Sequence, residues 1–170
     1  MNVKVIGAAM IIGGCGGFGF FTAFQHRHQE QLLRQLLRIL RLMQWELQYR
    51  LTALPELVRM AGKECGGELR SALLDFSREL DWHSGPDAYS CMHEALRRNR
   101  KLPPKVKALL RQLGKTLGKY DLEGQLQGLD VLRGECREAL ESLEKDRSHR
   151  IRSYQTLGLC AGAALAILFA

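Results

Sequence analysis

The sequence Gly114-Lys115-Thr116 is the first place where residue types could do chemistry, because it resembles the end of a phosphate-binding loop. That motif needs a glycine five positions before Gly114 and a strand-loop-helix context. Leu109 occupies the required position, and the surrounding apolar residues repeat with helical spacing. We therefore predict no nucleotide-binding loop here.

Metal-binding and nucleophilic groups are equally poorly spaced. His26 and His28 lie two positions apart, as do Cys91 and His93, whereas two ligands share one helix face at a spacing of four. No Ser/His/Asp or Cys/His set can be argued from spacing, and Ser90, next to Cys91 in a helical segment, is interpreted as a packing residue. We expect no catalytic, cofactor-binding or metal-binding residues, and we do not expect an enzyme.

Thiol chemistry is not indicated either. The chain has five cysteines with no C-x-x-C pair and no zinc-finger spacing. Reduced, structural thiols are the simplest interpretation. The five residues are Cys15, Cys65, Cys91, Cys136 and Cys160.

The strongest charge feature is a run of nine basic residues, with no acid, between Ala95 and Tyr120. Like charges at a spacing of four destabilise a helix slightly, so an acidic group is expected nearby. Candidates are the acidic last helix (Glu135, Glu138, Glu141, Glu144), a partner protein, anionic lipid or nucleic acid; a solvated face with internal pairing remains the alternative. The predicted partner-binding residues are Arg97, Arg98, Arg100, Lys101, Lys107, Arg111 and Lys115.

Helices must position these charges, because the apolar residues repeat at helical spacing throughout and no alternating run indicates a strand. A long first helix should bury Leu36, Leu40, Met43, Leu47 and Leu51. Thr52 is expected to cap a short helix that stops at Gly66-Gly67, followed by a helix over 68–80.

The second half of the chain predicts three more helices. Pro86 suits a first helical turn, and Pro103 and Pro104 separate that helix from the next. Gly118 should end the fifth helix and Asp121 should cap the last. Six helices result, with buried faces that include Leu69, Leu73, Phe76, Met92, Leu96, Val106, Leu110, Leu113, Leu129 and Leu132.

Both ends of the chain are uncharged: 21 residues run from Val5 to Gln25 without a charge, and 18 more from Ser153 to Ala170. A transmembrane helix needs about 20 mostly apolar residues. We predict transmembrane helices over 3–25 and 153–170 around a cytosolic helical bundle over 26–152. A cleaved signal peptide is the alternative for the first segment, and a buried terminal helix for the second.

Orientation follows from the fixed positive charge, which gathers on the bundle side of both segments and leaves only Lys4 outside. The bundle is therefore predicted to be cytosolic. Small residues spaced by four let membrane helices approach closely. Either pair of glycines could meet the other or a neighbouring subunit; the pairs are Gly13 with Gly17, and Gly158 with Gly162.

Several of these features together resemble the stage III sporulation protein AB family over essentially the whole chain. They are the glycine-rich first segment, the long Leu/Arg helix, the Thr52-x-x-Pro-Glu start, the stretch from Leu113 to Asp121 with Gln125 after it, and the Leu/Gly/Ala end. The chain is more distantly similar to the cytosolic domain of the type II secretion platform protein, a six-helix bundle with a G-E-x-x-G turn. Gly114 and Gly118 match that turn, but Lys115 replaces the expected acid.

The resemblance implies a scaffold in a secretion-like channel complex, in the mother-cell membrane that surrounds the forespore during sporulation. Its implied partners are a stage III sporulation protein AA-type ATPase, other channel subunits and the membrane, with a homo-oligomer as a further candidate. Gly114 would admit a neighbouring helix, and Gly118 would supply a positive φ before Asp121. The alternative is a membrane-tethered binder of anionic lipid or nucleic acid, although only Tyr120 lies near the basic run, so nucleic acid is not expected.

Overall fold

The protein is all-helical in the residues that the computed structural model describes, which are 27–82, 85, 87–118 and 121–169, with side chains up to Lys145. Within these residues there are six helices and no strand, so the predicted all-α class is confirmed. The first helix covers residues 27–49. The others are α2 (Leu54–Lys63), α3 (Gly67–Asp81), α4 (Ala88–Arg98), α5 (Pro104–Thr116) and α6 (Leu122–Phe169).

None of the helices in the described residues has the length and apolarity needed to cross a membrane. The predicted span over 3–25, with Gly13 and Gly17, lies outside those residues. The predicted span over 153–170, with Gly158 and Gly162, lies where α6 is described by its backbone alone. Both spans, and the boundaries of the bundle at 26 and 152, stay predictions.

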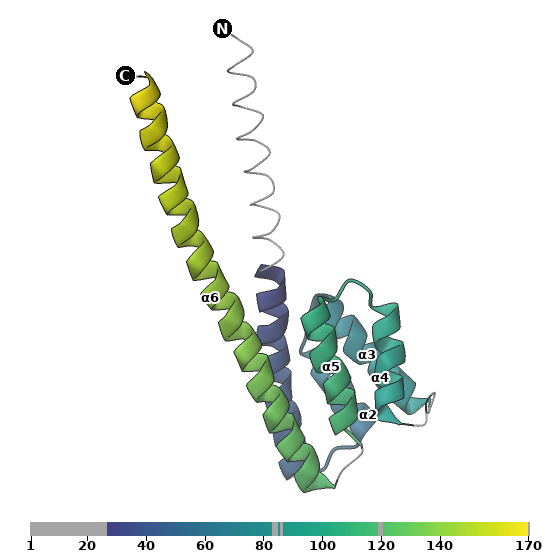
Figure 1. Ribbon diagram of the computed structural model, residues 1–170. Helices are drawn as coiled ribbons and strands as arrows, with labels where there is room; N and C mark the ends of the chain where they lie inside the picture. The colour runs from purple at the N-terminus through teal and green to yellow at the C-terminus, as the bar shows by residue number, and fades with distance from the viewer. Residues whose placement is uncertain (1–26, 83–84, 86, 119–120, 170) are drawn as a thin grey trace.

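The first helix and α6 run antiparallel as a long pair, and α2 to α5 form a compact group against one side of it (Figure 1). The Cys136 thiol donates to the carbonyl of Leu33 at 3.5 Å, and Nη1 of Arg133 donates to Oε1 of Gln44 at 2.7 Å. Helix α6 then continues well past the group of short helices. The fold is therefore an antiparallel pair of long helices, the first and the last, with a small bundle of the four short helices on one side of it.

The core follows the predicted apolar stripes. The largest fully buried side chains come from five helices: Phe76, Leu33, Leu36, Ile39, Leu40, Met43, Leu57, Leu69, Leu73, Met92, Leu110 and Leu113. Leu51 is the exception, because the first helix ends before it and its backbone has a φ of 51°. Its side chain is 70% exposed, so its predicted place in the core is wrong.

The start of α2 also differs from the prediction. Ala53, rather than Thr52, occupies the N-cap position, and it makes no side-chain cap hydrogen bond. The Thr52 hydroxyl instead donates to Oε2 of the buried Glu46 at 2.9 Å. A buried carboxylate needs hydrogen-bond donors, and this requirement outweighs the capping preference of threonine. Pro55, which lacks an N–H, suits the first turn of α2.

The later helix ends follow simple capping chemistry. Asp87 accepts a hydrogen bond from the N–H of Ser90 at 2.8 Å and so caps α4. Asp121 accepts from the N–H of Gly124 at 3.1 Å at the start of α6. Gly118 has a φ of 77°, which an L side chain rarely adopts, and it reverses the chain between α5 and α6. The predicted helix start at Pro86 lies outside the described residues.

Candidate functional site

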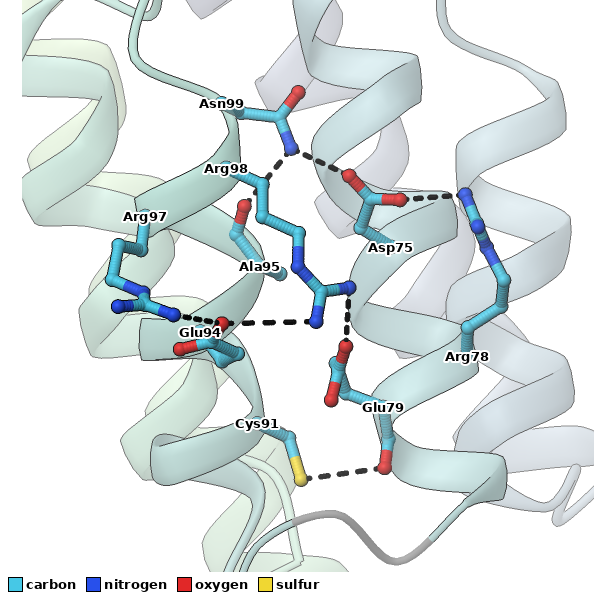
Figure 2. Close-up of polar contacts among 9 residues, drawn as sticks. All are labelled: Asp75, Arg78, Glu79, Cys91, Glu94, Ala95, Arg97, Arg98 and Asn99. Atoms are coloured by element: carbon cyan, nitrogen blue, oxygen red, sulfur yellow. Dashed lines mark hydrogen bonds and ion pairs between the residues drawn. The ribbon is translucent and has the colours of Figure 1, made fainter.

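The N-terminal part of the basic run lies in a polar network between α3 and α4 (Figure 2). The Arg98 guanidinium contacts Oε1 of Glu79 at 2.6 Å and Oε1 of Glu94 at 3.7 Å. Arg97 donates to the same Glu94 oxygen at 2.8 Å, and this hydrogen bond holds the pKa of the Glu94 carboxyl below its usual value. Arg97 and Arg98 are thus already paired within the bundle.

Arg98 matters most in this network because its partner is buried. The side chain of Glu79 is only 7% exposed, whereas that of Arg98 is 53% exposed. A buried carboxylate without a cation or donors would be strongly unfavourable. Arg98 is therefore primarily a structural residue, and this part of the predicted partner-binding set has an intramolecular role.

Asn99 fixes the chain as it leaves α4. Its side-chain Nδ2 donates to Oδ2 of Asp75 at 2.7 Å and to the carbonyl of Ala95 at 2.9 Å. Figure 2 shows the amide lying between α3 and the end of α4. The following residue is also held, because Nζ of Lys107 donates to the carbonyl of Arg100 at 2.9 Å. The α4–α5 loop is consequently well fixed in place.

An open depression lies beside this loop. Arg100 and Lys101 line it with exposed side chains, and neither makes an ion pair with another residue in the described ranges. The opposite wall is the first turn of α3. The complete lining is Gly67, Glu68, Ser71, Arg98, Asn99, Arg100 and Lys101.

The C-terminal part of the basic run lies on α5. Arg111 and Lys115 are exposed and one helical turn apart, while Lys107 is half-buried. Nζ of Lys115 lies 5.3 Å from the centroid of the Tyr89 ring, and Arg111 has no ion pair among the described residues. The run is therefore not one continuous stripe. Its exposed cations without an ion pair in the described residues form the loop pair, Arg100 and Lys101, with Lys105 beside it, and the α5 pair, Arg111 and Lys115.

Helix α5 is held closely on both sides. A Cβ atom at Gly114 would lie 2.7 Å from Cβ of Met92 in α4, so only glycine fits without displacing a helix. On the α6 side, a Cβ at Gly128 would lie 2.4 Å from Cγ2 of Thr116. The sequence analysis suggested the first close approach and did not identify the second. Arg111 and Lys115 are thus presented by a firmly packed helix.

The acidic last helix does not neutralise the α5 cations. Its Glu135 accepts a hydrogen bond from the Gln112 amide at 2.7 Å, and Glu144 pairs with Arg34 of the first helix at 2.7 Å. In the described residues, no ion pair joins this acidic group to the basic run. The internal pairing that does occur uses Glu79 and Glu94 instead.

Sequence reasoning missed an aromatic cluster on the first helix. The rings of Trp45 and Tyr49 lie 5.8 Å apart, and the Arg50 guanidinium lies 5.3 Å from the Trp45 centroid. Trp45 is 49% and Tyr49 67% exposed. The available signal was that Trp45 follows Arg38 and Arg41 at spacings of seven and four, on the face opposite the leucine stripe.

The described residues contain no arrangement that suggests a metal site or a reactive thiol. No group of three His, Cys, Asp or Glu residues in the described ranges is arranged to hold a metal ion. Cys65, Cys91 and Cys136 are free and buried. Burial raises the pKa of the thiols of Cys65 and Cys136 to about 11, which disfavours the reactive thiolate near neutral pH.

Comparison with known proteins places these features in context. The chain matches the sequence profile of the stage III sporulation protein AB family over residues 4–170. A solved structure of a stage III sporulation protein AB is similar to the chain with a TM-score of 0.64 and 22% sequence identity. The match covers 72% of this chain and 98% of that one, and at this identity it supports the fold alone. The comparison with curated proteins finds no match.

Proposed function

This chain belongs to the stage III sporulation protein AB family, and we propose that it is a membrane-anchored scaffold of a secretion-like channel complex that docks a cytosolic ATPase. Family membership connects it with sporulation. The proposed location is the mother-cell membrane around the forespore, and the proposed partners are a stage III sporulation protein AA-type ATPase and other channel subunits.

The observation that carries the docking proposal is the α5 pair of cations. Arg111 and Lys115 are exposed, project from a helix fixed by glycine contacts on two sides, and have no acidic partner in the described residues. Charges that are exposed and preorganised steer an oppositely charged partner and orient it. An acidic edge on the ATPase would supply the missing countercharge.

The anchoring proposal rests on the two uncharged ends of the sequence. Both uncharged ends adjoin the same end of the long helix pair, because the first helix starts there and α6 continues beyond the bundle in that direction (Figure 1). Two membrane segments leaving one end would hold the bundle on one side of the bilayer. The distribution of basic residues makes that side the cytosol.

Charge reversal tests the docking proposal. The full-length chain in detergent or nanodiscs would be assayed for binding to the ATPase, with Arg111→Glu and Lys115→Glu combined as the test variant. Lys63→Glu and Arg70→Glu together form the matched control, since these exposed residues on α2 and α3 carry the same total charge. Loss of binding in the test variant alone, with unchanged circular dichroism, is the expected result.

Equal binding by both variants would reject the α5 surface as the docking site. A short DNA duplex in the same assay separates the nucleic-acid alternative, because phosphate neutralisation produces a steep dependence on salt. Saturable DNA binding at physiological salt, without ATPase binding, would replace the scaffold proposal with a tethered nucleic-acid binder.

A further inference from the structure

We propose that the α4–α5 loop, through Arg100 and Lys101, rests on the anionic lipid headgroups of the membrane, separately from the α5 docking surface. This inference rests on the proposed anchoring by the two uncharged ends. It assigns the two groups of exposed, unpaired cations to two different partners: lipid for the loop, and protein for α5.

The position of the loop is the first argument. Glu68, in the wall of the depression opposite the loop, lies 3.3 Å from Nε2 of His28. The N–H of Gly66 donates to Oε1 of Gln35 at 3.0 Å, so the start of α3 is fixed beside the start of the first helix. The loop therefore lies at the end of the bundle where the first helix begins and past which α6 continues (Figure 1).

The distance to the predicted membrane segment is short. His28 is three positions after Gln25, the last residue of the uncharged stretch. Three residues span at most about 11 Å even when fully extended. The electrostatic screening length at physiological salt is about 8 Å, so charges near His28 would lie close to one screening length from the headgroups.

Charge balance at this end is the second argument. The cations without an ion pair in the described residues, at the ends of α2 to α5, are Lys63, Arg70, Arg100, Lys101 and Lys105. On α2 to α5, two acids lie at the same end, Glu64 and Glu68, and Glu68 is already engaged by His28. Glu30 of the first helix and Glu144 of α6 also lie near this end, and both pair with Arg34. A surplus of fixed positive charge that faces a membrane favours anionic lipid over zwitterionic lipid.

The backbone of the α4–α5 loop is also preorganised for contact with a surface. Asn99 ties its start to Asp75, and the carbonyl of Arg100 is held by Lys107. Pro103 restricts φ at its end. A loop whose backbone is already ordered loses little conformational freedom when it meets a surface. The side chains of Arg100 and Lys101 can therefore bind headgroups without rearrangement of the bundle.

A fluorescence test uses the full-length chain reconstituted in vesicles. Cys15 and Cys160 are replaced by alanine, and a dye is attached at Ser71→Cys, an exposed position in the wall of the depression. The buried native thiols react slowly at neutral pH. A dye at Gln127→Cys, in the first turns of α6 at the opposite end of the bundle, is the positional control.

The vesicles contain phosphatidylcholine alone, or phosphatidylcholine with an equal amount of phosphatidylglycerol, and carry a nitroxide quencher on the headgroup. We expect the Ser71→Cys dye to be quenched mainly in the anionic vesicles, and the Gln127→Cys dye in neither. Each Lys or Arg at an anionic surface contributes about fivefold to association, so Arg100→Ser with Lys101→Ser should lower the ratio of surface-bound to free loop about 25-fold.

The matched variant Arg111→Ser with Lys115→Ser removes the same charge from α5 and should leave the quenching unchanged. Either of two results would overturn the lipid contact while preserving the anchor. One is an equal loss of quenching in both double variants, and the other is no quenching in protein that resists carbonate extraction. Protein that carbonate extracts, but whose dye is still quenched, would reject the anchor and retain the lipid contact. Loss of both would reject both proposals.

Discussion

Replacing Gly114 by alanine tests the central packing feature of the bundle, the close approach of α4 and α5. The added Cβ would lie 2.7 Å from Cβ of Met92 and 3.3 Å from the carbonyl oxygen of Ala88. Neither atom is the end of a flexible side chain, so relief requires a shift of one helix against the other. Overpacking of this kind typically costs about 1–3 kcal/mol.

A second glycine provides the control. Gly134 lies in α6 with nothing within 4 Å of the position that a Cβ would occupy. Alanine there should stabilise the protein by about 0.5–1 kcal/mol, through helix propensity alone. Gly114→Ala gains the same propensity but pays the steric cost, so we expect it to destabilise by up to about 2 kcal/mol. Since the propensity gain is the same in both, the two variants should differ by the steric cost, about 1–3 kcal/mol.

Thermal unfolding of the full-length chain in mild detergent, followed by far-ultraviolet circular dichroism, measures this difference. For a chain of this size, 1 kcal/mol corresponds to about 2–4 °C, so the two melting temperatures should separate by about 2–12 °C. If Gly114→Ala melts at or above the temperature of Gly134→Ala, then α4 and α5 are not in the close contact described above, and the firm presentation of the α5 cations loses its basis.

Three further measurements test other parts of the fold. Arg98→Ala should destabilise by about 1–2 kcal/mol in urea titrations, because it leaves the Glu79 carboxylate buried without its cation. Arg97→Ala should have a much smaller effect, because its ion pair with Glu94 is exposed to solvent, and similar costs would contradict the structural role of Arg98. Leu51→Gly should stabilise by about 1 kcal/mol, since an exposed leucine with a φ of 51° is strained, and a lower melting temperature would contradict this. Stability should fall as pH rises from about 9 toward 11, because the unfolded chain ionises the thiols of Cys65 and Cys136 before the folded one does; alanine at both positions should flatten that dependence.

The sequence was sufficient for the number and order of the helices because the apolar stripes and the proline and glycine boundaries agree. Leu36, Leu40 and Met43 are fully buried as their spacing predicts. Helix ends were harder, since they depend on contacts that periodicity does not contain. The Thr52 hydroxyl donates to the buried carboxylate of Glu46 instead of capping α2, and Leu51 lies outside the core because the first helix ends before it.

The basic run could be located from the sequence, but its separation into paired and unpaired cations could not be predicted. A count of basic residues without acids locates the run along the chain, yet it could not show that Arg98 pairs with Glu79 on another helix. Nor could it separate the loop pair from the α5 pair, because that division depends on where α4 ends and how the chain turns. Pairing across helices is a property of the assembled bundle, and a single sequence records it only weakly.

Helix α6 has a mechanical consequence. Its 48 residues form one uninterrupted helix, which at about 1.5 Å per residue is roughly 70 Å long. An uninterrupted helix fixes the direction in which each residue faces as well as the distance between residues, since every residue turns the helix by about 100°. The face that carries Gly158 and Gly162 is thereby locked to the face of α6 that meets α5. A rotation of α6 where it packs against α5 would therefore turn the backbone at Gly158 and Gly162 through the same angle.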